Sequence, residues 1–142
     1  MYQWQSLLAD GNDCFHKKDW SQAEYYYKDA AFCLELLCAT NTKDIQLLMG
    51  WICALHNLAT LFEVQNNPDL SLKYLLIPHN RMLSITASNE QCEDMKLIAS
   101  NALKITFMPI LMFSKRHPIC PSCQQSLEEF KQNLEAQQCD IH

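Results

Sequence analysis

Two small residues on either side of a short polar turn constrain the fold of this chain more than any other feature. Gly11 and Ala23 lie on two segments whose apolar residues have helical spacing, with a polar turn at positions 17–19 between them. An aromatic residue follows each small residue by four positions, Phe15 after Gly11 and Tyr27 after Ala23. A small residue on each helix lets two antiparallel backbones approach closely, and the rings fill the space beside the contact. The segment therefore predicts a tight helical hairpin.

The composition predicts an all-α protein. The chain has only two glycines in 142 residues, which leaves few of the residues that β-turns and bulges require. Its hydrophobic content of 49% is typical of a globular chain rather than a disordered one. No stretch resembles a long linker, so we expect residues 1–142 to form a single domain.

Apolar periodicity and break signals predict about six antiparallel helices in three hairpins, at about 2–38, 44–86 and 88–138. Two capping-box spacings, Ser21/Glu24 and Ser88/Gln91, are expected at the starts of the second and fifth helices. Proline lacks the N–H that a helix interior needs, so Pro78 predicts a kink or short break in the fourth helix and Pro109 a bend in the fifth.

The charge pattern argues against nucleic acid as a partner. The formal net charge is −5, and no basic stripe is present to displace counterions from phosphates. The N-terminus lacks the basic start and continuous apolar run of a signal peptide, and apolar stretches such as 105–113 look too short to span a bilayer. We therefore expect a cytoplasmic protein without a membrane partner, whose cysteines are kept reduced.

Residues 11–30 resemble a tetratricopeptide repeat (TPR). The turn Asp19-Trp20 is typical of that family, and four residues match its small and aromatic pattern: Gly11, Ala23, Tyr27 and Ala30. The chain departs from the pattern at Asp10, where the family has a leucine, and at Glu35, where it has a closing proline. The resemblance implies a right-handed superhelix of helical hairpins.

Two weaker copies of the pattern follow the first. The second covers about 51–83 and is carried by Leu58, Ala59, Phe62, Ser71 and Leu75, with Pro78 in place of a small residue. The third centres on Ile98, Ala99 and Ala102. Gly11 and Ala59 are 48 residues apart, against about 34 in a regular repeat. The chain is thus similar to a degenerate TPR protein with longer helices.

The resemblance also implies a groove, lined by the first helix of each hairpin, in which an extended or helical peptide binds. In the first hairpin the groove residues would be Gln5, Leu8, Asn12, Phe15 and His16. In the second they would be Cys53, His56, Asn57, Thr60 and Glu63. The two asparagines would donate hydrogen bonds to the peptide backbone, and Phe15 would supply an apolar contact. Leu8 stands where a lysine of a carboxylate clamp would be, so no such clamp is predicted.

A structural role is the alternative for these residues. Apolar stripes at helical spacing usually face the core, which would account for Leu8 and Phe15, and His16 could be a cation at a helix end. A homodimer is a further variant, because the apolar ends of short helical arrays often pair.

The C-terminal cysteines are the one pattern with the spacing of metal ligands. Cys120 and Cys123, with Cys139 and His142, could supply three thiolates and an imidazole to zinc. A continuous helix between the two pairs would separate them by about 20 Å, which disfavours a shared ion within one chain. A site that includes His117, or one between two chains, stays open. The first pair could instead be a redox pair at a helix N-terminus, or simply two free thiols in a loop.

No arrangement of residues indicates catalysis. His56 could serve as a base, but no nucleophile or carboxylate is placed beside it by the spacing. The sequence therefore predicts a non-catalytic scaffold that binds a protein or peptide and needs no cofactor. The alternative is a zinc- or thiol-responsive protein that uses the C-terminal cysteines.

Overall fold

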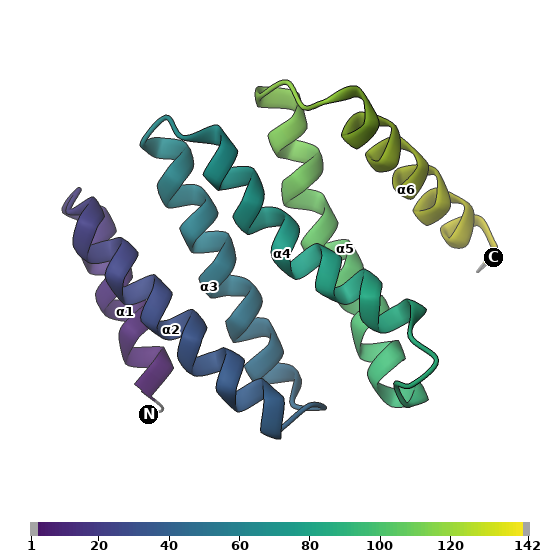
Figure 1. The fold of residues 1–142 in the computed structure, drawn as a ribbon, viewed down its shortest axis with the longest axis horizontal. Helices are drawn as coiled ribbons and strands as arrows, with labels where there is room; N and C mark the ends of the chain where they lie inside the picture. Colours follow the sequence, from purple (N-terminus) through teal and green to yellow (C-terminus); the bar gives the residue numbers. More distant parts are fainter. Residues whose placement is uncertain (1–2, 141–142) are drawn as a thin grey trace.

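The computed structural model describes residues 3–140, without the side chains of 137–140, and this part of the chain is all-helical. It forms six α-helices and no strand, which confirms the predicted fold class (Figure 1). The helices are α1 (Gln3–His16), α2 (Trp20–Thr40), α3 (Ile45–Val64), α4 (Pro68–Ala87), α5 (Glu93–Arg116) and α6 (Pro121–Asp140).

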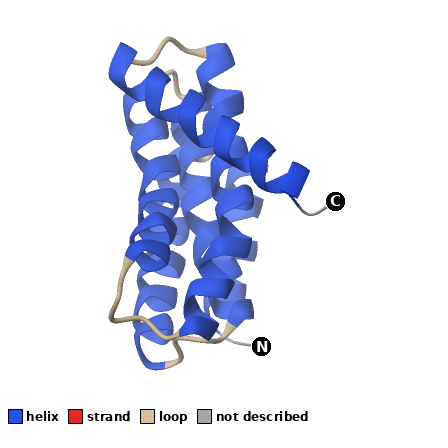
Figure 2. Ribbon diagram, turned by 90° about the vertical axis from the view of Figure 1, so that its right-hand side faces the viewer, coloured by secondary structure: helices blue, strands red, loops and turns tan. Residues whose placement is uncertain are grey.

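Consecutive helices pack side by side from α1 to α5, so the chain forms an array of antiparallel hairpins. The last helix, α6, lies across the other helices at an angle (Figure 2). The pairs α1–α2 and α3–α4 match the first two hairpins predicted from the sequence. Helices α5 and α6 fall within the range predicted for the third, but α6 crosses at an angle and does not lie along α5 as the second helix of a regular hairpin.

The centre of the core is α3, which lies between α2 and α4 and is buried on several sides. Ile52, Leu58 and Leu61 of this helix are almost fully buried. A smaller apolar cluster joins α6 to the array, and its members are Ala59, Leu75, Phe107, Ile110, Phe113 and Leu127. The covering helix α6 is therefore held mainly by a narrow apolar seam.

The close approach predicted for the first hairpin is present. A Cβ atom on Gly11 would lie 2.6 Å from the ring of Tyr27, which is closer than any real side chain tolerates. Gly50 meets the ring of Trp4 in the same way, at 2.9 Å. Each glycine in this chain therefore allows an aromatic ring of another helix to lie against its backbone.

The first two hairpins share one turn geometry. Lys18 and Asn66 are the residues with positive φ among those described, at 61° and 60°, and they are 48 positions apart. The amide that follows each one reaches back five residues, Asp19 N–H to the Cys14 carbonyl and Asn67 N–H to the Phe62 carbonyl, both at 2.9 Å. This pattern closes the C-terminus of the first helix. The same interval separates Gly11 from Ala59, so the repeat seen in the sequence is also a repeat of structure.

Both predicted capping boxes are wrong. The side chain of Asp19, not Ser21, caps α2 by accepting from the Gln22 N–H at 3.3 Å. Ser88 is the C-cap of α4, and its hydroxyl accepts from the Glu90 N–H at 3.1 Å, so it is not available to start the next helix. That helix, α5, begins only at Glu93.

The prolines inside helices do not interrupt them. Pro78 lies within α4 and Pro109 within α5, and both helices are continuous through the proline. The expected break near Pro78 is therefore absent. Pro78 is itself fully buried.

Helices α3 and α5 are long apolar segments, although apolar stretches such as 105–113 looked too short in the sequence to span a bilayer. By length and composition alone, α3 and α5 could each cross a membrane, with a mean hydropathy of 1.5. The core helix of a soluble protein can be equally long and apolar. In the most apolar stretch of α3, 61% is buried inside the protein, against 39% in that of α5. The length and apolar composition of these two helices therefore do not decide whether the protein crosses a membrane.

Candidate functional site

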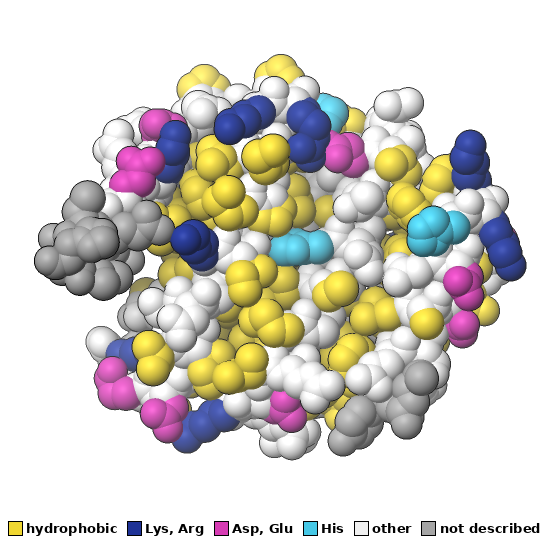
Figure 3. Space-filling model, turned by 180° about the vertical axis from the view of Figure 1, so that it is seen from behind, with side chains coloured by type: hydrophobic (Ala, Val, Ile, Leu, Met, Phe, Trp, Pro, Cys, Tyr) yellow, Lys and Arg dark blue, Asp and Glu magenta, His cyan; other side chains and the backbone are white. Residues whose placement is uncertain are grey.

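The first helices of the three hairpins, α1, α3 and α5, share one face of the array, which we call the binding face. In Figure 1 it lies behind α2 and α4, and Figure 3 shows it from behind. Apolar side chains gather over its middle, and charged side chains lie mostly toward its edges. Two hollows open on this face.

The first hollow lies between α1 and α3, has a volume of about 290 Å³, and contains most of the residues predicted for the first part of the groove. Its lining residues are Asn12, Phe15, His16, Tyr27, Asn57 and Thr60. Five of these were predicted from the sequence, and Tyr27 was predicted only as a packing residue. We call it the α1–α3 hollow.

A hydrogen-bonded pair forms the floor of the α1–α3 hollow. The Tyr27 hydroxyl donates to Asn12 Oδ1 at 2.6 Å, which leaves the Asn12 Nδ2 group as a donor. Burial raises the pKa of the Tyr27 phenol to about 12, so it stays protonated and keeps donating. His16 Nδ1 donates to the Asn12 carbonyl at 2.7 Å. The polar end of the hollow is therefore fixed by contacts within the first hairpin.

The second hollow, the α3–α5 hollow, has a volume of about 190 Å³. His56, Thr60 and Glu63 of α3 line it, and Pro109, Met112 and Arg116 of α5 complete it, with Ala59, Ser71 and Leu75 beneath. Because Thr60 lines both hollows, the two are adjacent and form one interrupted depression across the binding face.

His56 has an unused polar atom in this depression. Its Nε2 atom is buried and has no hydrogen-bond partner among the described residues. Burial lowers the pKa of His56, so the imidazole is neutral at pH 7. A buried polar atom without a partner is costly, which sets His56 apart among the residues that line the depression.

Glu63 is already paired. Arg116 holds its carboxylate with two hydrogen bonds of 3.0 and 3.1 Å, and His117 Nε2 lies 2.8 Å from Oε2. These partners, with Arg116 foremost, lower the pKa of Glu63. Its main contribution in this structure is to join the C-terminal ends of α3 and α5.

Three other predicted groove residues lie on the binding helices but outside both hollows. Gln5 is half-buried on α1, Leu8 is half-buried and packs against the main core, and Cys53 is exposed on α3. The core alternative therefore applies to Leu8. Phe15 belongs to both descriptions, because it lines a hollow and also packs against the core.

Met112 and Arg116 were missed by the sequence analysis. They come from the third and weakest copy of the repeat, where no groove residue was assigned. No sequence signal identifies them: the structure leaves four apolar residues of α5 exposed, Leu97, Ile105, Met108 and Met112, but this exposure cannot be read from the sequence.

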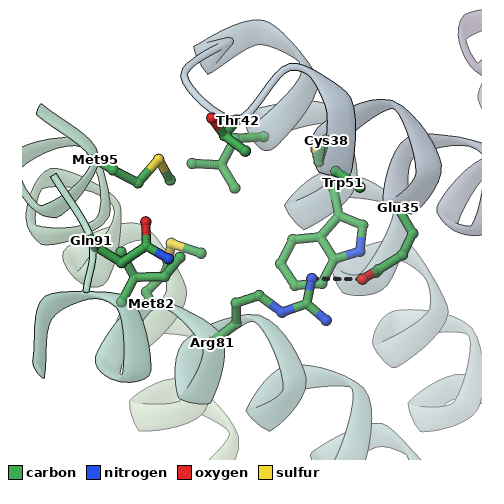
Figure 4. Close-up of a pocket in the computed structure, with 11 residues that line it drawn as sticks. Glu35, Cys38, Thr42, Trp51, Arg81, Met82, Gln91 and Met95 are labelled. Carbon is green, nitrogen blue, oxygen red and sulfur yellow. Dashed lines mark hydrogen bonds and ion pairs between the residues drawn. The ribbon is translucent and has the colours of Figure 1, made fainter. Parts of the chain in front are cut away.

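A further hollow of about 180 Å³ lies away from the binding face and has a structural role (Figure 4). The Arg81 guanidinium lies 4.5 Å from the centre of the Trp51 ring and pairs with Glu35 at 2.7 Å. These three residues come from α4, α3 and α2. The guanidinium is thus held by an ion pair on one helix and a cation–π contact on another, so these contacts join three helices.

The residues predicted for zinc are only partly described. Cys120 and Cys123 are exposed at the start of α6, whereas the Cys139 side chain and His142 lie outside the described residues. Because α6 is unbroken from Pro121 to Asp140, the separation argued from the sequence holds for a helix of this length. Over the part of the chain that is described, no group of three or more metal-binding side chains comes together.

The fold and the binding face together define the class of protein: an array of helical hairpins in which the first helix of each pair forms a hollowed face. The chain belongs to the DUF2753 family, described as proteins of unknown function, whose model matches residues 2–142. Comparison with curated proteins and with solved structures gives no match.

Proposed function

We propose that this protein is a non-catalytic scaffold that binds a peptide segment of a partner protein across the binding face. The observation that carries the proposal is the α1–α3 hollow, which is lined by residues of two hairpins. Two of them, Asn12 and Asn57, are 45 positions apart in the sequence. A degenerate TPR array in the cytoplasm, without nucleic acid or membrane as partner, is the setting we propose for it.

The chemistry of the depression suits a peptide backbone with small apolar side chains. Asn12 and Asn57 can donate from their side-chain amides, and His56 offers a neutral imidazole. Met112 and Phe15 supply apolar contacts at the two ends. Apolar walls with a few placed polar groups are typical of sites for peptides and small ligands.

Selection from a random peptide library, followed by calorimetry, tests the proposal. Peptides are selected against the wild-type chain, and their affinity is then measured for Thr60→Arg and for Asn12→Ala/Asn57→Ala. Thr60 is exposed and shared by both hollows, so an arginine there fills the depression without disturbing the Tyr27–Asn12 hydrogen bond. We expect each variant to weaken binding at least about tenfold, a loss of about 1.4 kcal/mol.

The matched control is Asn89→Ala/Asn133→Ala, which removes two exposed asparagines that line neither hollow. It should bind the selected peptides with wild-type affinity, and all variants should keep the wild-type helical content. Selected peptides that bind Thr60→Arg as tightly as the wild type would place the site elsewhere. A selection that enriches nothing would count against peptide binding.

A further inference from the structure

Two thiols stand at the start of α6, outside the binding face. Cys120 immediately precedes Pro121, the first residue of the helix, and Cys123 lies in its first turn. Both are exposed. Cys120 Sγ accepts from the Cys123 N–H at 3.3 Å and lies 3.3 Å from the Ser122 hydroxyl. The sulfur of Cys120 is thus turned back over the first helical turn, toward Cys123.

We propose that Cys120 and Cys123 are a redox-active pair that forms a reversible disulfide by exchange with a low-molecular-weight disulfide such as oxidised glutathione. The Cys120 sulfur lies 3.3 Å from the backbone nitrogen of Cys123, so the two side chains start from neighbouring positions. A disulfide needs Cβ atoms about 3.5–4.5 Å apart. The remaining movement is small and involves two exposed side chains.

Cys120 is the thiol that attacks. Hydrogen bonds from the Cys123 side chain, the Ser122 hydroxyl and the Cys123 N–H stabilise its thiolate and lower its pKa to about 7. The thiolate is the nucleophile in thiol–disulfide exchange, and a pKa near the ambient pH is the most effective for an attacking thiol.

In the first step the Cys120 thiolate attacks one sulfur of the small disulfide. A mixed disulfide forms on Cys120, and the other half of the small molecule leaves as a thiolate and takes up a proton. In the second step Cys123 loses its proton and attacks the Cys120 sulfur, which releases the second half as a thiol. Two protein thiols are oxidised, and the small disulfide is reduced to two thiols.

The order of the two steps follows from the pair's electrostatics. In the reduced protein the neighbouring Cys120 sulfur raises the pKa of Cys123, chiefly through the hydrogen bond between the two side chains. Formation of the mixed disulfide removes the negative charge from Cys120, so this effect ends when Cys123 is required to attack.

The surroundings of Cys123 leave room for its side chain to turn. It lines a hollow of about 340 Å³ between α4 and α6, together with Ser122 and the apolar side chains of Leu72, Leu76, Ile119 and Leu127. Because one side of Cys123 is open, it can change rotamer toward Cys120 without displacing a packed neighbour.

Mass spectrometry of the full chain tests the pair against a control within the same molecule. The reduced protein is incubated with oxidised glutathione at pH 7, quenched with acid, alkylated and digested with trypsin. One fragment, residues 117–131, carries both Cys120 and Cys123, and another, residues 82–96, carries Cys92. Cys92 is the matched control, because it is also an exposed cysteine at a helix N-terminus but has no second cysteine three or four residues away.

We expect fragment 117–131 of the wild type to lose two hydrogen atoms and to carry no glutathione. The same fragment of Cys123→Ser should carry one glutathione on Cys120, and that of Cys120→Ser should be nearly unmodified. Alkylation by iodoacetamide at pH 7 should be about three to six times faster at Cys120 than at Cys92, since a larger thiolate fraction outweighs the lower nucleophilicity. Two free thiols in the oxidised wild-type fragment, or glutathione on 117–131 and 82–96 to the same extent, would overturn the proposal.

Discussion

Among single residues, the buried histidine His79 has a specific effect on the stability of the fold. It is 5% exposed on α4 and packs against the rings of Phe107 and Phe130. The Thr106 hydroxyl donates to the Leu103 carbonyl at 3.1 Å, so it accepts from His79 Nδ1–H, which lies 2.9 Å away. Burial lowers the pKa of His79 to about 4, and the ring is neutral at pH 7.

This histidine predicts acid sensitivity. Between the unfolded pKa of about 6.5 and the folded pKa of about 4, the unfolded chain binds the extra proton, so the free energy of unfolding falls as the pH falls through this window. We expect a loss of about 2–3 kcal/mol from His79 between pH 7 and pH 4.5. Urea unfolding of the wild type and of His79→Gln at both pH values measures it. An equal pH dependence in the two proteins would contradict the assignment.

A second prediction concerns the close contact between Gly11 and the Tyr27 ring. Gly11→Ala puts a Cβ atom 2.6 Å from the Tyr27 ring, and we expect overpacking to cost about 1–3 kcal/mol, offset by about 1 kcal/mol of helix propensity. The second hairpin has Ala59 and Leu75 at the corresponding positions. A double-mutant cycle with Tyr27→Leu should therefore show a smaller cost for Gly11→Ala than in the wild type. Additive effects would mean that the ring contact is not the cause.

At the scale of elements, the turn between α1 and α2 carries avoidable strain. Lys18 has a φ of 61°, in the left-handed region that glycine adopts without a steric penalty. Lys18→Gly should raise the free energy of unfolding by about 0.5–1 kcal/mol. The control is Lys17→Gly, one position earlier in the same turn, where φ is not positive. Thermal unfolding of the two variants compares them, and an equal or lower melting temperature for Lys18→Gly would contradict the account.

The helices and most of their ends could be predicted from periodicity and break signals, but the capping residues and the start of α5 could not. Asp19 and Ser21 are both good N-cap residues, and Asp19, directly after the turn at Lys18, takes the position. Ser88 fails as a cap because its hydroxyl serves the local turn at Glu90. Pro78 breaks an isolated helix but stays inside α4, because the packing of the array holds the helix on both sides of it.

At the scale of the whole molecule, the binding face was only half predictable. Asn12 and Asn57 could be placed on one face because two hairpins repeat the same pattern. The contribution of α5 could not, since its repeat signal is weak and its partners are distant in sequence. One such distant contact joins Glu63 to Arg116, which lies 53 positions later in the sequence. This ion pair gives Glu63 a role in joining helices.

The proposed function requires that the partner binds across α1, α3 and α5. Photo-crosslinking in the source cell tests it most directly, with a benzophenone amino acid introduced at Thr60 or, as a control, at Phe32. Phe32 is 68% exposed on α2 and lines neither hollow. We predict a discrete protein adduct from position 60 that is absent from position 32 and is lost in the Asn12→Ala/Asn57→Ala background. An adduct from position 32 alone would contradict the claim.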